Sequence, residues 1–229
     1  MSPIISKSDK SELYNKNWYE NVYVNFETKV WHCRPFARAI RFFGIKNALD
    51  IGTASGYLVK ALMNQKINVK GVDVSKELIQ DSPVKENIYW VDLDDEKLPF
   101  SSEYFNLVTA FDVLEHCFRL ENVLKELNRV LIVGGYLMVQ IPEISMDDSP
   151  THVTSQTKEQ WIKQIENNSF EYVNLQKRLF IILWIFSFII EVFLRFKEGK
   201  RGRQIISASY VPFQPYKSWP DHFLIFKKH

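Results

Sequence analysis

The sequence predicts an α/β fold in which a parallel sheet is covered by helices on both faces. In the first half of the chain, short apolar runs that end at an acidic or small residue alternate with helical segments. The strand candidates are residues 46–51, 68–72, 87–91, 105–111 and 136–141. Strands that alternate with helices at this rhythm indicate a parallel sheet with helices on both sides.

The helix after the fourth strand has the clearest periodicity. Its apolar positions are Leu120, Val123, Leu124, Leu127, Val130 and Leu131. This spacing gives one stripe along a helix of period 3.6, and we expect Gly134-Gly135 to end the helix.

The second half of the chain supplies one more helix and two more strands. Thr157 and Gln160 fit a capping box, which opens a helix whose buried side carries Trp161, Ile162 and Ile165. Residues 170–175 and 222–227 are the sixth and seventh strands, and a long insertion separates them.

Bulk composition limits the class of protein. The 229 residues are 46% hydrophobic and 24% charged, which is ordinary for a soluble globular enzyme with one main core and an added subdomain. A formal charge of +2 gives no reason to expect a nucleic-acid partner. Cys33 and Cys117 are too few for a disulfide framework, and from the polar start of the chain we expect no signal peptide. We therefore expect a cytoplasmic protein with reduced thiols.

The strongest local motif is ALDIGTASGYLVKAL at residues 48–62, a strand followed by a glycine turn and a helix start. Gly52 permits a sharp turn, and Gly56 permits close approach of the helix start to a ligand. A dinucleotide-binding loop needs G-x-G-x-x-G, because its second glycine makes room for a pyrophosphate. Ala54 occupies that second position here, so the spacing disfavours a nicotinamide-dependent oxidoreductase.

Three aspartates fall at the ends of neighbouring strands. Asp50 lies near the end of the first strand, Asp73 ends the second and Asp92 ends the third. Open parallel sheets bind ligands at this carboxyl edge, where a carboxylate can accept hydrogen bonds from ribose hydroxyls or an adenine amine. The alternative is that each aspartate is only a turn former or helix cap. Their joint placement favours a nucleoside site.

Five motifs in order now support a family resemblance. ALDIGTASGYL, VKGVDVS, WVDLDDEKLPF, FNLVTAFDVLEH and LNRVLIVGGYLMVQIPE together resemble the class I S-adenosylmethionine-dependent methyltransferase domain, over residues 46–177 and the closing strand 222–227. The resemblance implies a Rossmann-like seven-stranded sheet in the order 3-2-1-4-5-7-6, with strand seven antiparallel. It also implies an N-terminal helical cap at 1–46 and a methyltransferase domain at 47–229, with an insertion at 178–218.

The resemblance further implies S-adenosylmethionine as cofactor and assigns its contacts. The methionine part would lie over the first loop, at Asp50, Gly52, Thr53, Ala54 and Gly56. The ribose would meet Asp73 beside Val74, the adenine Asp92 and Leu93, and the methionine end the backbone near Phe111. Two positions depart from the usual pattern, Ala54 for glycine and Asn106 for aspartate, and neither removes a group that cofactor binding needs.

Two histidines are candidates for the acceptor step. Methyl transfer is an in-line displacement that depends on positioning the acceptor, and an oxygen acceptor also needs a general base. His116, in the LEH segment after the fourth strand, and His152, after the fifth, lie where such a base is expected. Alternatively, each only braces its loop. The histidines are scattered and Cys117 is isolated, so no zinc-type spacing appears and we predict no metal site.

The insertion holds one very apolar segment. Residues 179–190 are apolar except for Ser187, and residues 195–203 then carry five basic residues against Glu198. The run is shorter than the roughly 20 residues of a membrane span, and the two strands that flank it belong to one sheet. It either covers the acceptor pocket or pairs two subunits, or it lies in a membrane interface with its basic end on anionic headgroups. We favour membrane contact through 179–203, at the inner face of a membrane.

The sequence thus predicts a methyltransferase that acts on a small-molecule, sugar-type or lipid-linked acceptor. The competing hypothesis is a non-catalytic nucleoside-binding or scaffold protein with the same fold. The acidic residues at positions 50, 73 and 92 argue against loss of binding but do not bear on turnover.

Overall fold

The computed structural model describes residues 7–14, 26–142, 151–174, 182, 185, 186, 189 and 223–229. Within them lie β1 (Asn47–Ile51), β2 (Asn68–Asp73), β3 (Ile88–Trp90), β4 (Phe105–Phe111), β5 (Leu131–Gln140), β6 (Phe170–Tyr172) and β7 (Phe223–Lys228). These strands form one sheet in the order β3-β2-β1-β4-β5-β7-β6. β7 is antiparallel to both of its neighbours, whereas β1 to β5 pair in parallel. The predicted fold class and strand order are confirmed.

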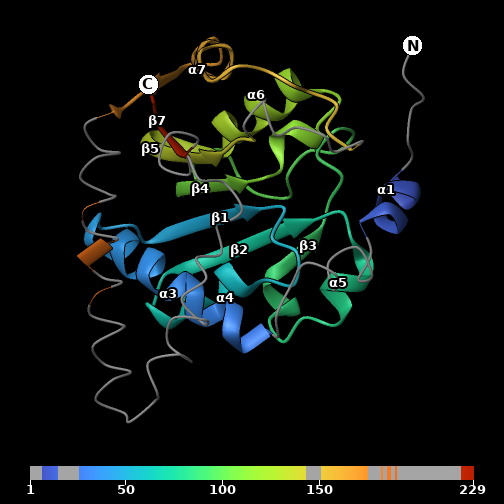
Figure 1. Ribbon diagram of the computed structural model, residues 1–229, viewed down its shortest axis with the longest axis vertical. Coiled ribbons are helices and arrows are strands. Elements are labelled where there is room, and N and C mark those ends of the chain that lie inside the picture. Colours follow the sequence, from blue (N-terminus) through green and yellow to red (C-terminus); the bar gives the residue numbers. More distant parts are fainter. Residues whose placement is uncertain are drawn as a thin grey trace.

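Helices cover the two faces of this sheet (Figure 1). They are α1 (Lys7–Leu13), α3 (Phe26–Phe42), α4 (Tyr57–Asn64), α5 (Lys76–Gln80), α6 (Leu120–Val130) and α7 (Lys158–Glu166), with short 3-10 helices η1 (Lys85–Asn87) and η2 (Leu114–His116). Side chains alternate along a strand, so Ala48 joins the core under α3 and α4, while Leu49 and Ile51 join the core under α6 and α7. The sheet is therefore buried on both faces.

The end of α6 differs from the prediction. The apolar stripe is buried as expected, but the helix ends at Val130, and Gly134-Gly135 lies inside β5 instead of ending the helix. Gly134 has a left-handed φ of 79°, near the point where the pairing of β5 with β4 shifts register between Phe105 and Leu107. A strand irregularity of this kind needs a residue that tolerates positive φ, so the glycines serve the strand.

The capping box of α7 is confirmed. The Thr157 hydroxyl accepts from the backbone N–H of Gln160, and the Gln160 side chain accepts from the backbone N–H of Thr157. Trp161 and Ile165 are fully buried and Ile162 is partly buried. The cap starts the helix at the register that buries this face.

Most of the predicted insertion lies outside the described residues, as do parts of the N-terminal segment and residues 143–150. Four residues of the apolar run are described. Ile182, Ile185, Phe186 and Ile189 are helical, and their exposed fractions are 49–62%. Among the residues with described placement, no helix is both long enough and apolar enough to cross a membrane.

Candidate functional site

Three buried aspartates gather at the carboxyl edge of the sheet. β3, β2 and β1 are parallel neighbours, with Asp50 opposite Gly71 and Asp73 opposite Trp90. Asp50, Asp73 and Asp92 are each 3–6% exposed. α1 lies beyond the edge toward which the β1 arrow points (Figure 1). The structure thus brings the three predicted carboxylates to one place.

The loop after β1 turns sharply at two glycines. Gly52 and Gly56 have left-handed φ values of 65° and 77°, and Gly56 caps α4. A Cβ at Gly52 would collide with the side chain of Val113, and one at Gly56 would lie 2.7 Å from Val84 and from Ile88. The sharp turn at Gly52 agrees with the prediction. Protein side chains also require a glycine at position 56, because α4 begins directly against them. The approach of a ligand to Gly56 stays a prediction.

Asp73 holds this loop through its carboxylate. Oδ2 accepts the backbone N–H of Ala54 at 2.7 Å, and Oδ1 accepts that of Ser75 at 2.7 Å. Burial raises the pKa of Asp73, and the hydrogen bonds from Ser75, Ala54 and Val74 oppose the rise. Each carboxylate oxygen has a second lone pair, so hydrogen bonds from a ligand remain available to the same group.

Asp50 is tied to the neighbouring strand. Its Oδ1 accepts the hydroxyl of Thr109, on β4, at 2.7 Å. Burial raises the pKa of Asp50 to about 6, while the hydrogen bond from Thr109 lowers it and the nearby Asp73 raises it. A positively charged ligand group at this edge would favour the ionised form.

Asp92 has one oxygen engaged and one without a partner. Oδ1 accepts from Lys10 Nζ at 2.9 Å and from the backbone N–H of Asp94 at 3.0 Å. Oδ2 is buried and has no hydrogen-bond partner among the described residues. A buried acceptor without a donor is costly, so Oδ2 is suited to receive an amine from a ligand such as adenine.

Residues of α1 and of the turn that follows it complete this edge, and no pattern in the sequence indicated them. Lys10 Nζ also lies 2.7 Å from Asp94 Oδ2, and its side chain is buried. Ser11 Oγ accepts the backbone N–H of Lys76 at 3.0 Å, and the Tyr14 hydroxyl lies 3.2 Å from His116 Nδ1. These contacts join positions at least 65 residues apart, which no local pattern in a seven-residue helix could indicate.

The other residues predicted to contact the cofactor have different surroundings in the structure. The carbonyl of Val74 accepts the indole N–H of Trp90 at 2.8 Å, and Leu93 is partly buried against the core under α6 and α7. The ring of Phe111 packs against Phe36 and Phe223, with ring centroids 5.5 and 5.9 Å apart. The side chain of Phe111 therefore serves the core, and its backbone role stays a prediction.

The two predicted histidines lie together. The rings of His116 and His152 meet edge to face with centroids 4.8 Å apart. His116 Nδ1 lies 3.0 Å from the carbonyl oxygen of Thr151, and the backbone N–H groups of Val153 and Thr154 donate to the carbonyl of Glu115. These bonds attach the loop after β5 to η2, so both histidines belong to one site.

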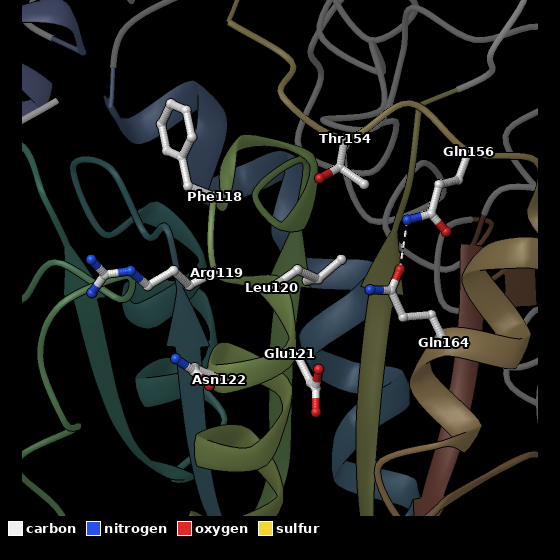
Figure 2. Close-up of a pocket in the computed structure, with 8 residues that line it drawn as sticks. All are labelled: Phe118, Arg119, Leu120, Glu121, Asn122, Thr154, Gln156 and Gln164. Carbon is white, nitrogen blue, oxygen red and sulfur yellow. Dashed lines mark hydrogen bonds between the residues drawn. The ribbon is translucent and has the colours of Figure 1, made fainter. Parts of the chain in front are cut away.

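A polar pocket of about 360 Å³ adjoins the histidines. Figure 2 shows it between the start of α6, the loop at Thr154 and Gln156, and α7, with Gln156 and Gln164 joined by a hydrogen bond. Phe118 and Thr154, which line it, are each two residues from a histidine of the pair. The pocket is therefore a neighbour of the histidine pair.

Comparison with known proteins agrees with this geometry. Residues 49–139 match the family model described as a methyltransferase domain. A malonyl-(acyl-carrier protein) O-methyltransferase of Legionella pneumophila is 34% identical over 101 residues, covering 41% of this chain and 35% of that protein. A ubiquinone/menaquinone biosynthesis C-methyltransferase of Pseudomonas savastanoi is 31% identical over 114 residues, 44% of each chain. The chain thus spans less than half the length of these curated relatives.

A solved structure shares the fold over nearly the whole chain. The crystal structure of a SAM-dependent methyltransferase from Archaeoglobus fulgidus superposes with a TM-score of 0.58 at 17% identity, covering 94% of this chain and 100% of that one. The matched domain, the strand order and this superposition agree with each other. The chain therefore matches the methyltransferase-domain family over residues 49–139 and has the fold of SAM-dependent methyltransferases.

Proposed function

We propose that this protein binds S-adenosylmethionine at the edge formed by Asp50, Asp73 and Asp92 and transfers its methyl group to an acceptor. The observation that carries the proposal is the group of three buried carboxylates at or just after the ends of adjacent parallel strands. Among them, Asp92 Oδ2 is buried and lacks a donor among the described residues. In this assignment Asp73 holds the ribose, Asp92 the adenine amine, and the loop at 52–56 the methionine part.

The charge of the site supports this cofactor. S-adenosylmethionine carries a positive sulfonium and an ammonium group, and it supplies an activated methyl group when bound. Asp50 and Asp73 are buried carboxylates that burial alone disfavours in the ionised form. A cationic ligand would compensate that cost, which favours the charged cofactor over its product without the sulfonium charge.

The histidine pair is proposed to act in the acceptor step. When Nδ1 of His116 donates to the carbonyl of Thr151, its Nε2 carries the lone pair and can accept a proton. The same bond fixes the orientation of the ring. Either His116 or His152 then acts as the general base, which removes the proton of the acceptor as the methyl group is transferred.

The acceptor is proposed to be a small molecule or a lipid-linked compound. The relatives act on oxygen or on carbon by their names, so the element methylated stays open. The exposed residues Ile182, Ile185, Phe186 and Ile189 follow the i, i+3, i+4, i+7 spacing of one helix face. With the basic run at 195–203, this face supports contact with a membrane or a lipid-linked acceptor; pairing of two copies of the chain is the alternative.

Calorimetric titration with S-adenosylmethionine, its demethylated product and NAD tests the cofactor assignment. We expect one site that takes the first two and does not take NAD. Transfer of labelled methyl to a panel of small-molecule and lipid-linked acceptors then tests turnover. Binding without turnover on every acceptor would favour the non-catalytic scaffold, and binding of NAD alone would overturn the proposal.

A further inference from the structure

We propose that Glu115, His116 and His152 form a binding site for a divalent transition-metal cation. One ligand atom from each of the three side chains lies within 4.8 Å of the other two. Glu115 and His116 come from η2, and His152 comes from the loop 36 residues later. No spacing motif could indicate this group, because the tertiary structure assembles it from two separate loops.

The burial of Glu115 points to a cationic partner. The residue is 1% exposed, and an ionised carboxylate is costly to bury unless a cation pairs with it. The two imidazoles beside it are half-buried and meet edge to face. The cluster therefore places one buried acid beside two imidazoles that can share a cation with it.

Hydrogen bonds to the backbone orient the cluster for metal binding. His116 Nδ1 lies 3.0 Å from the Thr151 carbonyl, and a ligating histidine commonly donates its other ring N–H to a carbonyl in this way. His116 would then bind through Nε2. The N–H groups of Val153 and Thr154 donate to the Glu115 carbonyl at 2.9 and 3.1 Å. These bonds hold the two segments that carry the ligands at a fixed separation.

The ligand types indicate which cations fit. Two imidazoles and one carboxylate match the three-ligand set of catalytic zinc sites, which keep a further position open. In a tetrahedral site, metal–ligand bonds of about 2.0–2.2 Å place the ligand atoms about 3.3–3.6 Å apart. From a spread of 4.8 Å, the ligand atoms must therefore approach one another by about 1.3 Å, which rotation about the side-chain torsions supplies.

A cation at this site would also specify the class of acceptor, and this part of the inference rests on the proposed function. A metal lowers the pKa of a bound oxygen group and polarises it. The open position would hold an acceptor hydroxyl or carboxylate oxygen, and the polar pocket beside the cluster would leave room for the rest of the molecule. The acceptor class would then be one methylated on an oxygen that can ligate a metal.

The test measures binding of Co²⁺ and Zn²⁺ to chelator-treated protein, by calorimetry and by the visible spectrum of Co²⁺, with no acceptor present. We expect one cation per chain. His152→Ala and Glu115→Gln should each weaken binding at least tenfold, while His229→Ala, at an exposed histidine at the chain end, should not. Because Glu115 is buried, His152→Ala on the half-exposed loop is the decisive variant if Glu115→Gln unfolds.

No binding by the wild type, or equal binding by wild type and His152→Ala, would overturn the metal site. S-adenosylmethionine titrations on the same samples separate the two proposals. Intact cofactor binding without metal binding removes only the metal site, whereas metal binding without cofactor binding removes only the proposed function.

Discussion

The carboxylate of Asp73 accepts the backbone N–H of Ala54 at 2.7 Å, so the end of β2 fixes the turn that follows β1. Ala54 has a left-handed φ of 50°, a conformation that a residue with a side chain adopts at a cost. The residue proposed to hold the ribose therefore also shapes the loop proposed to hold the methionine part. Cofactor affinity and loop stability should be coupled through this one side chain.

Asp73→Ala should weaken S-adenosylmethionine binding by on the order of 1–3 kcal/mol, because a charged acceptor of hydrogen bonds is lost. That loss is roughly a 5- to 150-fold rise in Kd. Calorimetry measures it, and a thermal unfolding curve shows that the variant is folded. The control Asp95→Asn changes an exposed carboxylate paired with Arg119 and should bind normally. Unchanged affinity for Asp73→Ala would remove this residue from the site.

Ala54→Gly should leave stability nearly unchanged, unlike the same substitution in a helix. Relief of about 1–2 kcal/mol of left-handed strain offsets the lost methyl burial and the added flexibility of the unfolded chain. Ala61→Gly, buried inside α4, has no strain to relieve and should cost about 1–2 kcal/mol. Urea unfolding of both variants measures the difference. Equal losses would show that Ala54 is not strained.

Asp50→Asn should change the pH dependence of stability. The folded-state pKa of Asp50 is about 6, above its ordinary value of 3.8. Between these values the folded protein keeps a proton that the unfolded chain has released, so this group lowers stability as pH rises. The free energy of unfolding of Asp50→Asn, relative to that of wild type, should therefore rise between pH 4 and pH 7. The rise should be up to about 3 kcal/mol, since each pKa unit corresponds to about 1.4 kcal/mol.

Urea unfolding at pH 4.5 and 7.5 checks this for cofactor-free protein. Glu159→Gln, an exposed acid in the first turn of α7, controls for the change in net charge. A stability difference between Asp50→Asn and wild type that is the same at both pH values would mean that the Asp50 carboxyl does not titrate in this range.

Replacing His116 or His152 by alanine should lower turnover once an acceptor is known. The expected loss is roughly 10²–10⁴-fold if the residue is the general base. Cofactor affinity should stay nearly unchanged, because the two histidines lie in η2 and in the loop after β5, whereas the three proposed cofactor carboxylates lie at or just after the ends of β1, β2 and β3. Initial rates of labelled methyl transfer provide the measurement. His229→Ala is the matched control. Full turnover by both single variants would exclude the pair from the acceptor step.

The exposed face at Ile182, Ile185, Phe186 and Ile189 should bind membranes that contain anionic lipid. Flotation with such liposomes should be reduced by Phe186→Glu combined with Ile189→Glu, since charges on the apolar face oppose insertion. Phe42→Glu combined with Val133→Glu, at two exposed apolar residues elsewhere, is the control. Equal flotation of wild type and the face variant would exclude membrane contact. The apolar face would then cover the acceptor pocket or pair two subunits.

The sheet and the three aspartates at its edge could be predicted because their signals are local. A buried parallel strand is a short apolar run, and the aspartates at residues 50, 73 and 92 end or follow such runs. Because parallel strands point the same way, residues at their ends must gather at one edge. The capping box at Thr157 is equally local, since all its atoms lie within one helical turn. Order along the chain was enough for these features.

Other features depended on what folding brings close together. Gly134-Gly135 resembles a helix stop in sequence, and only its pairing with β4 makes it a strand irregularity. Lys10 reaches Asp92 across 82 positions, and His152 meets His116 across 36. Such contacts leave no periodicity or spacing in the sequence, because the energy that stabilises them exists only after the intervening chain has packed. The sequence by itself determined the fold and the edge that carries the three aspartates. The tertiary structure decided which residues complete that edge and which side chains lie beside it.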